Sequence, residues 1–210
     1  MTSLVVLIPV KASGPKSRLS EVLSLKERLE LGALLLGGVL KAVEQAGLIK
    51  VTHVVSSNKS ILEFAMGHGA GAIPEPRDAG VDSAVIRGIR RAGFPDSVLV
   101  LPSDLPFIRG MEIRRLLALK SAGFDMVLVP SSAFDGTNAL LFRPTSGLTL
   151  SYDDNSFWNH LKGGARKGLS IGVSSERGLM FDIDSPDDFR FLAHSRAEAS
   201  TVVFARRAGR

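Results

Sequence analysis

The residue on which chemistry is most easily built is an aspartate that follows a short apolar run and lies between two prolines. Residues 98–101 are Val-Leu-Val-Leu without polar alternation, which is typical of a strand buried on both faces of a parallel sheet. Asp104 follows this run between Pro102 and Pro106. Ligands of open α/β sheets bind beyond the carboxyl ends of the strands, so we predict that Asp104 belongs to a binding site. A helix cap or a turn is the alternative role.

A basic loop follows the apolar run at residues 4–10 and offers a partner for anions. The loop carries the cations Lys11, Lys16 and Arg18, and its Gly14-Pro15 pair permits a tight turn with exposed backbone N–H groups, as in phosphate-binding loops. It matches neither the P-loop pattern nor the dinucleotide-binding pattern, which disfavours P-loop kinases and dinucleotide-dependent dehydrogenases. A solvated basic loop is the alternative interpretation.

Two further carboxylates, Asp182 and Asp184, stand two residues apart, so in an extended segment their side chains leave the same face. If this segment lies beside the end of the Asp104 strand, three oxygen ligands converge with neither His nor Cys among them. That donor set selects Mg²⁺ or Mn²⁺ over zinc. The alternative is a helix-entry pair favoured by the helix dipole, a role that Asp187 and Asp188 already fill.

A metal held by carboxylates opposite lysine and arginine side chains suits the transfer of a nucleotidyl or phosphoryl group, because that reaction depends mostly on positioning and charge neutralisation. Hydrolase triads have no support. The histidines at 53, 68, 160 and 194 show no ligand spacing, and no serine stands in a nucleophile elbow.

The composition is that of an ordinary globular protein, with 210 residues of which 45% are hydrophobic and 22% charged. We predict one domain over residues 1–195, followed by a basic C-terminal tail at 196–210. The chain has no cysteine, which excludes disulfides and thiolate metal sites. The opening Met-Thr-Ser-Leu-Val lacks the basic segment and cleavage site of a signal peptide, so we expect a cytoplasmic protein.

The net charge of +5 would suit polyanionic partners, but the cations are spread along the chain, and one Tyr and one Trp offer little for base stacking. We therefore expect no nucleic-acid partner. No apolar stretch approaches the roughly 20 residues that cross a bilayer, so we expect no membrane partner either.

Hydrophobic periodicity positions these residues on alternating strands and helices. Strands are predicted at 4–10, 51–57, 98–101 and 125–130. Helices are predicted between the Ser24–Glu27 capping box and Gly47, over 59–66 after Asn58, from Asp82 or Ser83, and over 109–122. Residues 72–80 are predicted to be a loop.

The alternation changes after residue 130, where a turn and a short strand replace a crossover helix, which indicates a hairpin or a mixed sheet. Residues 144–156 are predicted to be a substrate loop, followed by a helix from Ser156, a strand over 169–175 and a helix that Ser185 caps with Pro186 in its first turn. The predicted fold is a three-layer α/β/α domain with a mainly parallel, mixed sheet.

Five short motifs occur in a fixed order: Ile-Pro-Val-Lys at 8–11, Lys-Ser-Arg-Leu at 16–19, Leu-Pro-Ser-Asp-Leu-Pro at 101–106, Gly-Thr-Asn-Ala-Leu at 136–140 and Asp-Ile-Asp-Ser-Pro-Asp-Asp at 182–188. Together they make residues 4–192 resemble the 2-phospho-L-lactate guanylyltransferase family. The resemblance implies a nucleotide-diphospho-sugar transferase-like fold, GTP and a phospho-acid as substrates, Mg²⁺ as cofactor, and release of pyrophosphate. The implied product is lactyl-2-diphospho-guanosine, used in building coenzyme F420. A homodimer is left open.

The resemblance also assigns roles to residues. The implied metal ligands are Asp104, Asp182 and Asp184. The implied catalytic residues are Lys11, Lys16, Arg18 and Asp104. The implied nucleotide-binding residues are Pro9, Lys11, Lys16, Arg18, Gly80, Asp82, Ser83, Pro102 and Asp104. The implied phospho-acid-binding residues are Thr137, Asn138 and Ser156.

Two segments depart from the family pattern. Gly80-Val-Asp-Ser83 stands where Gly-Leu-Asn-Ala is usual, and Asp153-Asp-Asn-Ser156 stands where Gly-Pro-Gly-Ser is usual. Asp82 is suited to accept the N1–H and N2–H donors of guanine, with a helix N-cap as its alternative role. We expect the aspartates at 153 and 154 to point away from the acceptor, or to pair with Lys162 or Arg166.

Two other functions remain open from the sequence. A related nucleotidyltransferase could use phosphoenolpyruvate or another phospho-acid, since phosphoenolpyruvate presents the same phosphate and carboxylate. A non-catalytic nucleotide-binding module would keep the fold without the reaction.

Overall fold

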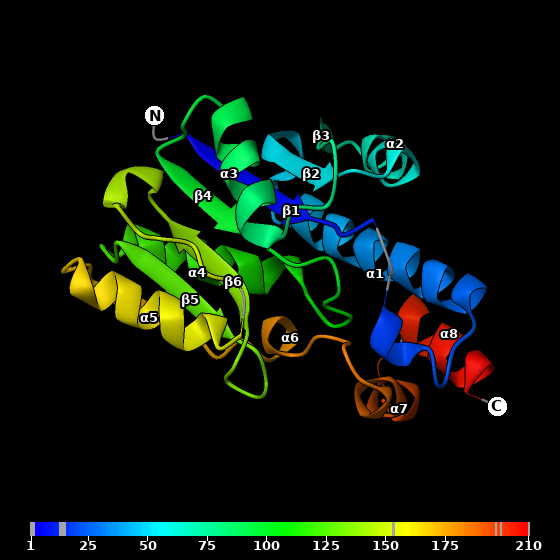
Figure 1. Cartoon of the computed structure of the whole chain (residues 1–210). Helices are drawn as coiled ribbons and strands as arrows, with labels where there is room; N and C mark the ends of the chain where they lie inside the picture. Colours follow the sequence, from blue (N-terminus) through cyan, green and yellow to red (C-terminus); the bar gives the residue numbers. More distant parts are fainter. Residues whose placement is uncertain (1–2, 13–15, 153, 196, 198, 210) are drawn as a thin grey trace.

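The computed structural model describes residues 3–12, 16–152, 154–195, 197 and 199–209. Gly14, Pro15 and Asp153, which carry expectations from the sequence, lie outside the described residues. The described part of the chain is built on a seven-stranded sheet with the order β3-β2-β1-β4-β6-β5-β7 (Figure 1).

The strands are β1 (Leu4–Pro9), β2 (Thr52–Ser56), β3 (Gly71–Pro74), β4 (Ser97–Val100), β5 (Met126–Pro130), β6 (Thr137–Phe142) and β7 (Ile171–Val173). The helices are α1 (Leu25–Gln45), α2 (Lys59–Gly67), α3 (Val81–Arg91), α4 (Gly110–Ser121), α5 (Ser156–Arg166), α6 (Arg177–Met180), α7 (Pro186–His194) and α8 (Ser200–Ala208). Short 3₁₀ helices are η1 (Ser17–Leu19), η2 (Ile49–Val51) and η3 (Pro144–Ser146).

Strand β6 makes the sheet mixed. It runs antiparallel to both of its neighbours, β4 and β5, whereas the other strand pairs are parallel. The hairpin from β5 to β6 is the break in alternation that the sequence indicates after residue 130. The carboxyl ends of β1, β2 and β4 therefore share one edge, where the loops that follow them meet.

Helices cover both faces of the sheet and give the three predicted layers (Figure 1). On one face, α1, α2 and α4 share an apolar core with the strands, with Val39, Leu62 and Ile113 among its buried members. On the other face, α3 and α5 form a second core that includes Val85 and Phe157. The predicted α/β/α fold with a mainly parallel, mixed sheet is confirmed.

Local chemistry explains several helix boundaries. The Ser24 hydroxyl accepts a hydrogen bond from the Glu27 N–H, and the Glu27 carboxylate accepts one from the Ser24 N–H, which forms the predicted capping box of α1. The Asn58 side chain accepts from the backbone N–H groups of the first turn of α2. Ser185 caps α7 with Pro186 in its first turn, as predicted.

Two segments differ from the expectation. Residues 72–74, expected to be part of a loop, belong to β3, which pairs only with β2 among the described strands. Pro74 ends this edge strand, where a missing N–H costs little. The segment 196–210, treated from the sequence as a tail, contains α8, whose Val202 and Phe204 are buried in a third core with α7 and the first half of α1. The apolar residues within this basic segment allow the helix to pack against α1.

Candidate active site

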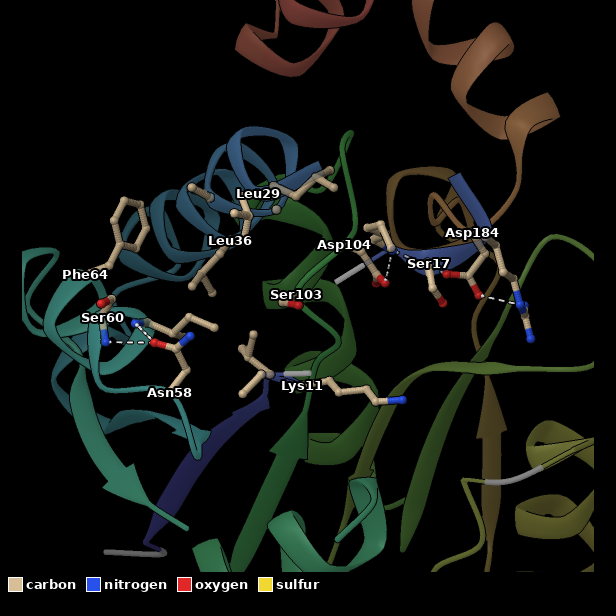
Figure 2. A pocket seen from close by; sticks show the side chains of 18 residues that line it. Lys11, Ser17, Leu29, Leu36, Asn58, Ser60, Phe64, Ser103, Asp104 and Asp184 are labelled. Carbon is tan, nitrogen blue, oxygen red and sulfur yellow. Dashed lines mark hydrogen bonds and ion pairs between the residues drawn. The ribbon is translucent and has the colours of Figure 1, made fainter. Parts of the chain in front are cut away.

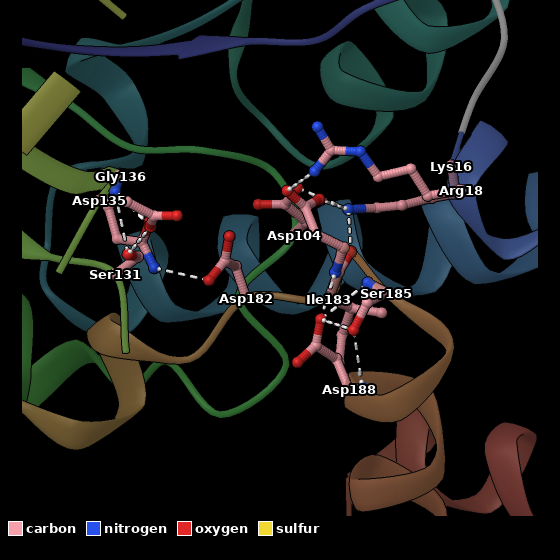
Figure 3. Close-up of polar contacts among 12 residues, drawn as sticks. Lys16, Arg18, Asp104, Ser131, Asp135, Gly136, Asp182, Ile183, Ser185 and Asp188 are labelled. Carbon is pink, nitrogen blue, oxygen red and sulfur yellow. Dashed lines mark hydrogen bonds and ion pairs between the residues drawn. The ribbon is translucent and has the colours of Figure 1, made fainter. Parts of the chain in front are cut away.

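The polar centre of the molecule is a cluster of charges around Lys16. Its ammonium lies 2.6 Å from Asp104 Oδ2 and 3.3 Å from Asp184 Oδ1, and it also donates to the carbonyl oxygen of Ile183 (Figure 3). The Ile183 N–H donates to the Asp104 carbonyl at 3.3 Å, which ties the 182–184 segment to the loop after β4. The structure thus brings together a cation and two carboxylates that are far apart in the sequence.

The conformation of Lys16 directs it into this cluster. The residue has φ 51° and ψ 43°, a left-handed conformation that turns the chain just before η1. Burial acts to lower the pKa of Lys16, but the charges of Asp104 and Asp184 outweigh it, so the pKa is raised and the side chain stays protonated. Arg18 lies at the open side of the cluster, where its Nη1 is 3.5 Å from Asp184 Oδ2.

Asp182 belongs to the same region and is half-buried. Its Oδ1 accepts a hydrogen bond from Asn138 Nδ2 at 3.2 Å, and the same amide donates to the carbonyl of Met180 at 3.0 Å. Burial, and then the negative charge of Asp104, raise the pKa of Asp182 to about 6. Negative charge is therefore concentrated here, which is what a bound cation would offset.

The described residues include no group of three or more His, Cys, Asp or Glu side chains arranged to hold a metal ion. The three aspartates expected as ligands lie in one region, but Lys16 stands between Asp104 and Asp184, and Asn138 holds Asp182. Two carboxylates and the oxygens of a bound phosphate are the usual ligands of Mg²⁺, and the aspartates can contribute to such a set.

Three cavities lie in this part of the molecule, and residues of the cluster line two of them. The first, of about 510 Å³, contains Lys16, Asp104 and Asp184 at its polar end and side chains of α1 and α2, such as Leu36 and Phe64, at its apolar end (Figure 2). Lys11 lines both the first and the second cavity. Asp184 lines both the first and the third. The charged cluster therefore lines the first and third cavities, and Lys11 connects the first cavity to the second.

The second cavity, of about 570 Å³, holds the sequence-predicted residues Pro9, Lys11, Gly80 and Asp82. Ser83 and Pro102, which the sequence also assigns to the nucleotide, are not part of its lining. Gly80, not Asp82, is the N-cap of α3, so the capping alternative for Asp82 is wrong. The carboxylate of Asp82 instead accepts the backbone N–H of Tyr152 at 3.0 Å.

Two carboxylates of the second cavity were not expected from the sequence. Glu75 follows β3, and burial together with the charge of Asp78 raises the pKa of Glu75. Asp78 accepts hydrogen bonds from the Ala12 N–H, at 3.1 Å, and from the Ser57 hydroxyl, at 2.8 Å. A cavity lined by carboxylates suits a group rich in hydrogen-bond donors, such as guanine and ribose hydroxyls, better than it suits a triphosphate.

The third cavity, of about 450 Å³, lies between the β5–β6 hairpin, the start of α5 and the 182–184 segment. Ser156 and Asp182 line it together with Ser131, Asp135 and Gly136. Gly136 is expected from the sequence only as the first residue of a motif, and Ser131 and Asp135 are not among the expected site residues. The Asp135 carboxylate accepts hydrogen bonds from the Ser131 hydroxyl and the Gly136 N–H, both at 2.7 Å (Figure 3). Asp154 also lines this cavity, and the expected pairing of Asp154 with Lys162 or Arg166 stays a prediction.

The buried side chain of His160 links Thr137, which the sequence assigns to the phospho-acid, to the loop before α5. His160 Nε2 accepts the Ser151 N–H at 3.0 Å, so the ring proton lies on Nδ1, which donates to Thr137 Oγ1 at 3.0 Å. Burial lowers the pKa of His160 to about 4, which keeps the ring neutral. The Thr137 N–H donates to Ser156 Oγ at 2.8 Å. His160 was not identified from the sequence as a site residue, because its partners come from β6 and from the loop before α5 and are brought to it only by the fold.

The fold and the charged cluster at the carboxyl ends of β1 and β4 define a nucleotidyltransferase-like protein. A solved structure described as a putative nucleotide-diphospho-sugar transferase from Desulfovibrio desulfuricans superposes with a TM-score of 0.77 at 16% identity, covering 99% of this chain and 95% of that one. The family model described as guanylyl transferase CofC like matches residues 4–207. The chain belongs to this family of guanylyltransferases.

Curated relatives agree with this assignment. The chain is 37% identical over 204 residues to a phosphoenolpyruvate guanylyltransferase of Rubrobacter xylanophilus, covering 96% of both chains. It is 30% identical over 194 residues to a 2-phospho-L-lactate guanylyltransferase of Methanococcoides burtonii, covering 92% of this chain and 85% of the relative. The family resemblance expected from the five motifs is confirmed.

Proposed function

We propose that this protein transfers the guanylyl group of GTP to the phosphate of a three-carbon phospho-acid. A phosphate oxygen of the acid attacks the α-phosphorus of GTP, the bond from that phosphorus to the oxygen bridging to the β-phosphorus breaks, and pyrophosphate leaves. The observation that carries the proposal is the cluster of Lys16, Asp104 and Asp184, which lines the first cavity and, through Asp184, the smaller third cavity. Lys11 joins the first cavity to the second, which suits a nucleoside.

The cations of the basic loop neutralise the triphosphate in this proposal. Lys16 is protonated and buried against two carboxylates, so it is fixed in position before a ligand arrives. Arg18 is largely exposed and Lys11 lines two cavities, so both can turn toward phosphate oxygens. Charge neutralisation by fixed cations is the main catalytic demand of such a transfer.

Asp104, Asp182 and Asp184 would hold a divalent metal, Mg²⁺ or Mn²⁺, together with phosphate oxygens of the substrate. The metal would supply charge neutralisation at the phosphates. What supports this assignment is the hard oxygen donor set, together with the pKa of Asp182, which burial and then the negative charge of Asp104 raise to about 6.

The acceptor is assigned to the third cavity. Its volume of about 450 Å³ suits a small molecule, and Thr137, Asn138 and Ser156 border it or stand next to residues that do. The first candidate for the phospho-acid is 2-phospho-L-lactate, because the motifs of the chain resemble those of 2-phospho-L-lactate guanylyltransferases. Phosphoenolpyruvate is the second, and what favours it is the 37% identity to a phosphoenolpyruvate guanylyltransferase, against 30% to a 2-phospho-L-lactate guanylyltransferase.

Other parts of the proposal concern the protein as a whole. Within the part of the chain that the structure describes, no helix combines the length and the hydropathy of a membrane-spanning segment. The cytoplasmic location, the homodimer and the absence of a nucleic-acid partner stay predictions from the sequence.

The proposal is tested by pyrophosphate release from the purified protein with GTP or ATP, with each phospho-acid, and with Mg²⁺, Mn²⁺ or EDTA. We expect release only when GTP, a phospho-acid and a divalent metal are all present, and the acid with the higher kcat/KM identifies the acceptor. A non-catalytic module would bind GTP without releasing pyrophosphate. Equal release with every phosphorylated acid, or with no acid, would argue against the acceptor assignment.

A further inference from the structure

Strand β6 begins with a β-bulge. Val129 of β5 pairs with Ala139, but the next residue of β5, Pro130, pairs with Thr137, so Asn138 is the extra residue of β6. Bulges of this kind re-aim a side chain and are frequent next to active sites. The direction of Asn138 is therefore set by the bulge and not by the alternation of side chains along the strand.

The bulge turns Asn138 toward the segment that carries Asp182. Leu140, two residues further along β6, packs into the core shared with α3 and α5, so regular alternation would place Asn138 on that face of the sheet. The Asn138 amide instead donates to the Met180 carbonyl at 3.0 Å and to Asp182 Oδ1 at 3.2 Å. Met180 packs against the core on the other face. The two donors of the amide are thus directed at oxygens of the protein itself.

The backbone on either side of Asp182 is fixed by other contacts. The Gly178 N–H donates to the carboxylate of Glu112 at 3.0 Å, and the Ile183 N–H donates to a carbonyl of the loop after β4 at 3.3 Å. Glu112 is 1% exposed, and a side chain at Gly178 would overlap it. These contacts hold the chain but leave the carboxylate free to rotate. Within the described ranges, Asn138 is the one side chain that donates a hydrogen bond to that carboxylate.

We propose that Asn138 is a positioning residue that holds the Asp182 carboxylate in its metal-binding orientation. Hydrogen bonds to ligating carboxylates orient them, and with Oδ1 held by the amide, Oδ2 is the oxygen left for the metal. A neutral donor does this without offsetting the negative charge that attracts the cation. The inference rests on the proposed function, which takes Asp182 as a metal ligand. It changes the role of Asn138 from contact with the phospho-acid, as expected from the sequence, to orientation of a ligand.

The test measures metal binding directly. The dissociation constant of Mn²⁺ is determined by electron paramagnetic resonance, with the protein saturated by the α,β-methylene analogue of GTP, which cannot release pyrophosphate. We expect Asn138→Ala to weaken Mn²⁺ binding by roughly 10-fold or more, because the Asp182 carboxylate loses its fixed orientation. In the reaction with GTP, the variant should need proportionally more Mg²⁺, and at saturating Mg²⁺ its KM for the phospho-acid should equal that of the wild type.

A double-mutant cycle shows whether the effect passes through Asp182. Asp182→Asn removes the charge of the ligand, so adding Asn138→Ala to this background should weaken Mn²⁺ binding no further. A general structural loss would weaken it in both backgrounds. Thr52→Val is the control for stability, because it removes a buried hydrogen bond to the Leu48 carbonyl at the amino end of β2 and should keep the Mn²⁺ affinity of the wild type. If melting curves show that Asn138→Ala is unfolded, Asn138→Ser replaces it in the cycle.

The outcomes distinguish this inference from the proposed function. Unchanged Mn²⁺ affinity with a raised KM for the phospho-acid would return Asn138 to the acceptor, and equal weakening in both backgrounds would make its role structural. Either result overturns the inference and leaves guanylyl transfer standing. If the cycle gives the expected affinities but the wild type releases no pyrophosphate with GTP and any phospho-acid, the role of Asn138 is supported and the proposed transfer is overturned. A wild type that binds no Mn²⁺ with the analogue overturns both the role of Asn138 and the proposed metal site.

Discussion

At the scale of single residues, Lys16 is the point at which the charges of the site meet. It contacts Asp104 and Asp184 and has little exposed side-chain surface, with a relative accessibility of 13%. An ammonium held in this way needs no reorganisation when a phosphate arrives, which is the condition under which fixed charges are most effective in catalysis. The carboxylates thus orient a cation in addition to any metal that they bind.

Asp104→Asn tests this arrangement directly. The neutral amide has nearly the same shape but no longer offsets the charge of Lys16 or of a metal, so we expect kcat/KM for pyrophosphate release to fall by roughly 100-fold or more. The melting temperature should change by only a few degrees, because Asp104 lies in a polar cavity. Asp187→Asn, at an exposed helix start, is the matched control and should cause only a mild loss. Full activity of Asp104→Asn would exclude a role for this carboxylate in catalysis.

Thr137→Ala tests the acceptor half of the site. The Thr137 hydroxyl accepts a hydrogen bond from His160 Nδ1, so its own proton stays available for the carboxylate of a phospho-acid. We expect the variant to raise the KM for the phospho-acid severalfold while the KM for GTP stays nearly unchanged, as steady-state kinetics with each substrate varied in turn will show. An equal rise in both values would assign Thr137 to the nucleotide half of the site.

At the scale of elements, the loop that follows β6 is joined to α5 through His160. The ring accepts from Ser151 and donates to Thr137, so one neutral side chain fixes the loop and the first residue of β6. Protonation would remove the acceptor at Nε2 and place an unpaired charge inside the protein, which explains why burial lowers the pKa of His160.

This burial predicts a pH dependence of stability. The pKa of His160 is about 4 in the folded protein against an ordinary value of 6.5, so between these values the unfolded chain binds a proton that the folded protein does not. The contribution of His160 to the free energy of unfolding is therefore complete above pH 6.5 and is lost as the pH falls toward 4, by roughly 3 kcal/mol in total.

Urea unfolding between pH 4 and 7 measures this contribution. His160→Gln cannot take up the proton, so the pH dependence of its unfolding free energy should be shallower than that of the wild type in this interval. Identical slopes for the two proteins would show that His160 does not control acid stability.

The positions of the site residues on the strands and helices were only partly predictable from the sequence. Lys16, Asp104 and Asp184 were expected at one edge because each follows a strand or an extended segment, and the carboxyl ends of parallel strands meet. The direct contact of Lys16 with both carboxylates was not predicted, because it depends on the left-handed turn at that residue. His160 was missed for a related reason: its partner Thr137 becomes a neighbour only through the packing of β6 and α5.

At the scale of the whole molecule, α8 connects the end of the chain to its first helix. Phe204 is buried in a core with Leu31 and Leu35 of α1, and Arg207 pairs with Glu30 of the same helix at 2.6 Å. Since the first half of α1 also forms part of the wall of the first cavity, this contact supports the framework around the charged cluster.

Phe204→Ala should therefore destabilise the protein by roughly 3–5 kcal/mol, the usual cost of truncating a buried aromatic side chain. Val203→Ala is the matched control, because Val203 on the same helix is 63% exposed and its truncation should change stability by less than about 0.5 kcal/mol. Chemical denaturation of both variants gives the comparison. Equal stabilities would show that α8 does not contribute to folding.

The central claim is that the molecule joins a guanylyl group to a phospho-acid. Phosphorus NMR of a reaction mixture that contains the protein, GTP, Mg²⁺ and either 2-phospho-L-lactate or phosphoenolpyruvate tests this claim most directly. We predict that the acceptor phosphate signal is replaced by two coupled diphosphate signals, with pyrophosphate formed in equal amount. Unchanged GTP, or its conversion to GDP and phosphate while the phospho-acid stays intact, would contradict it.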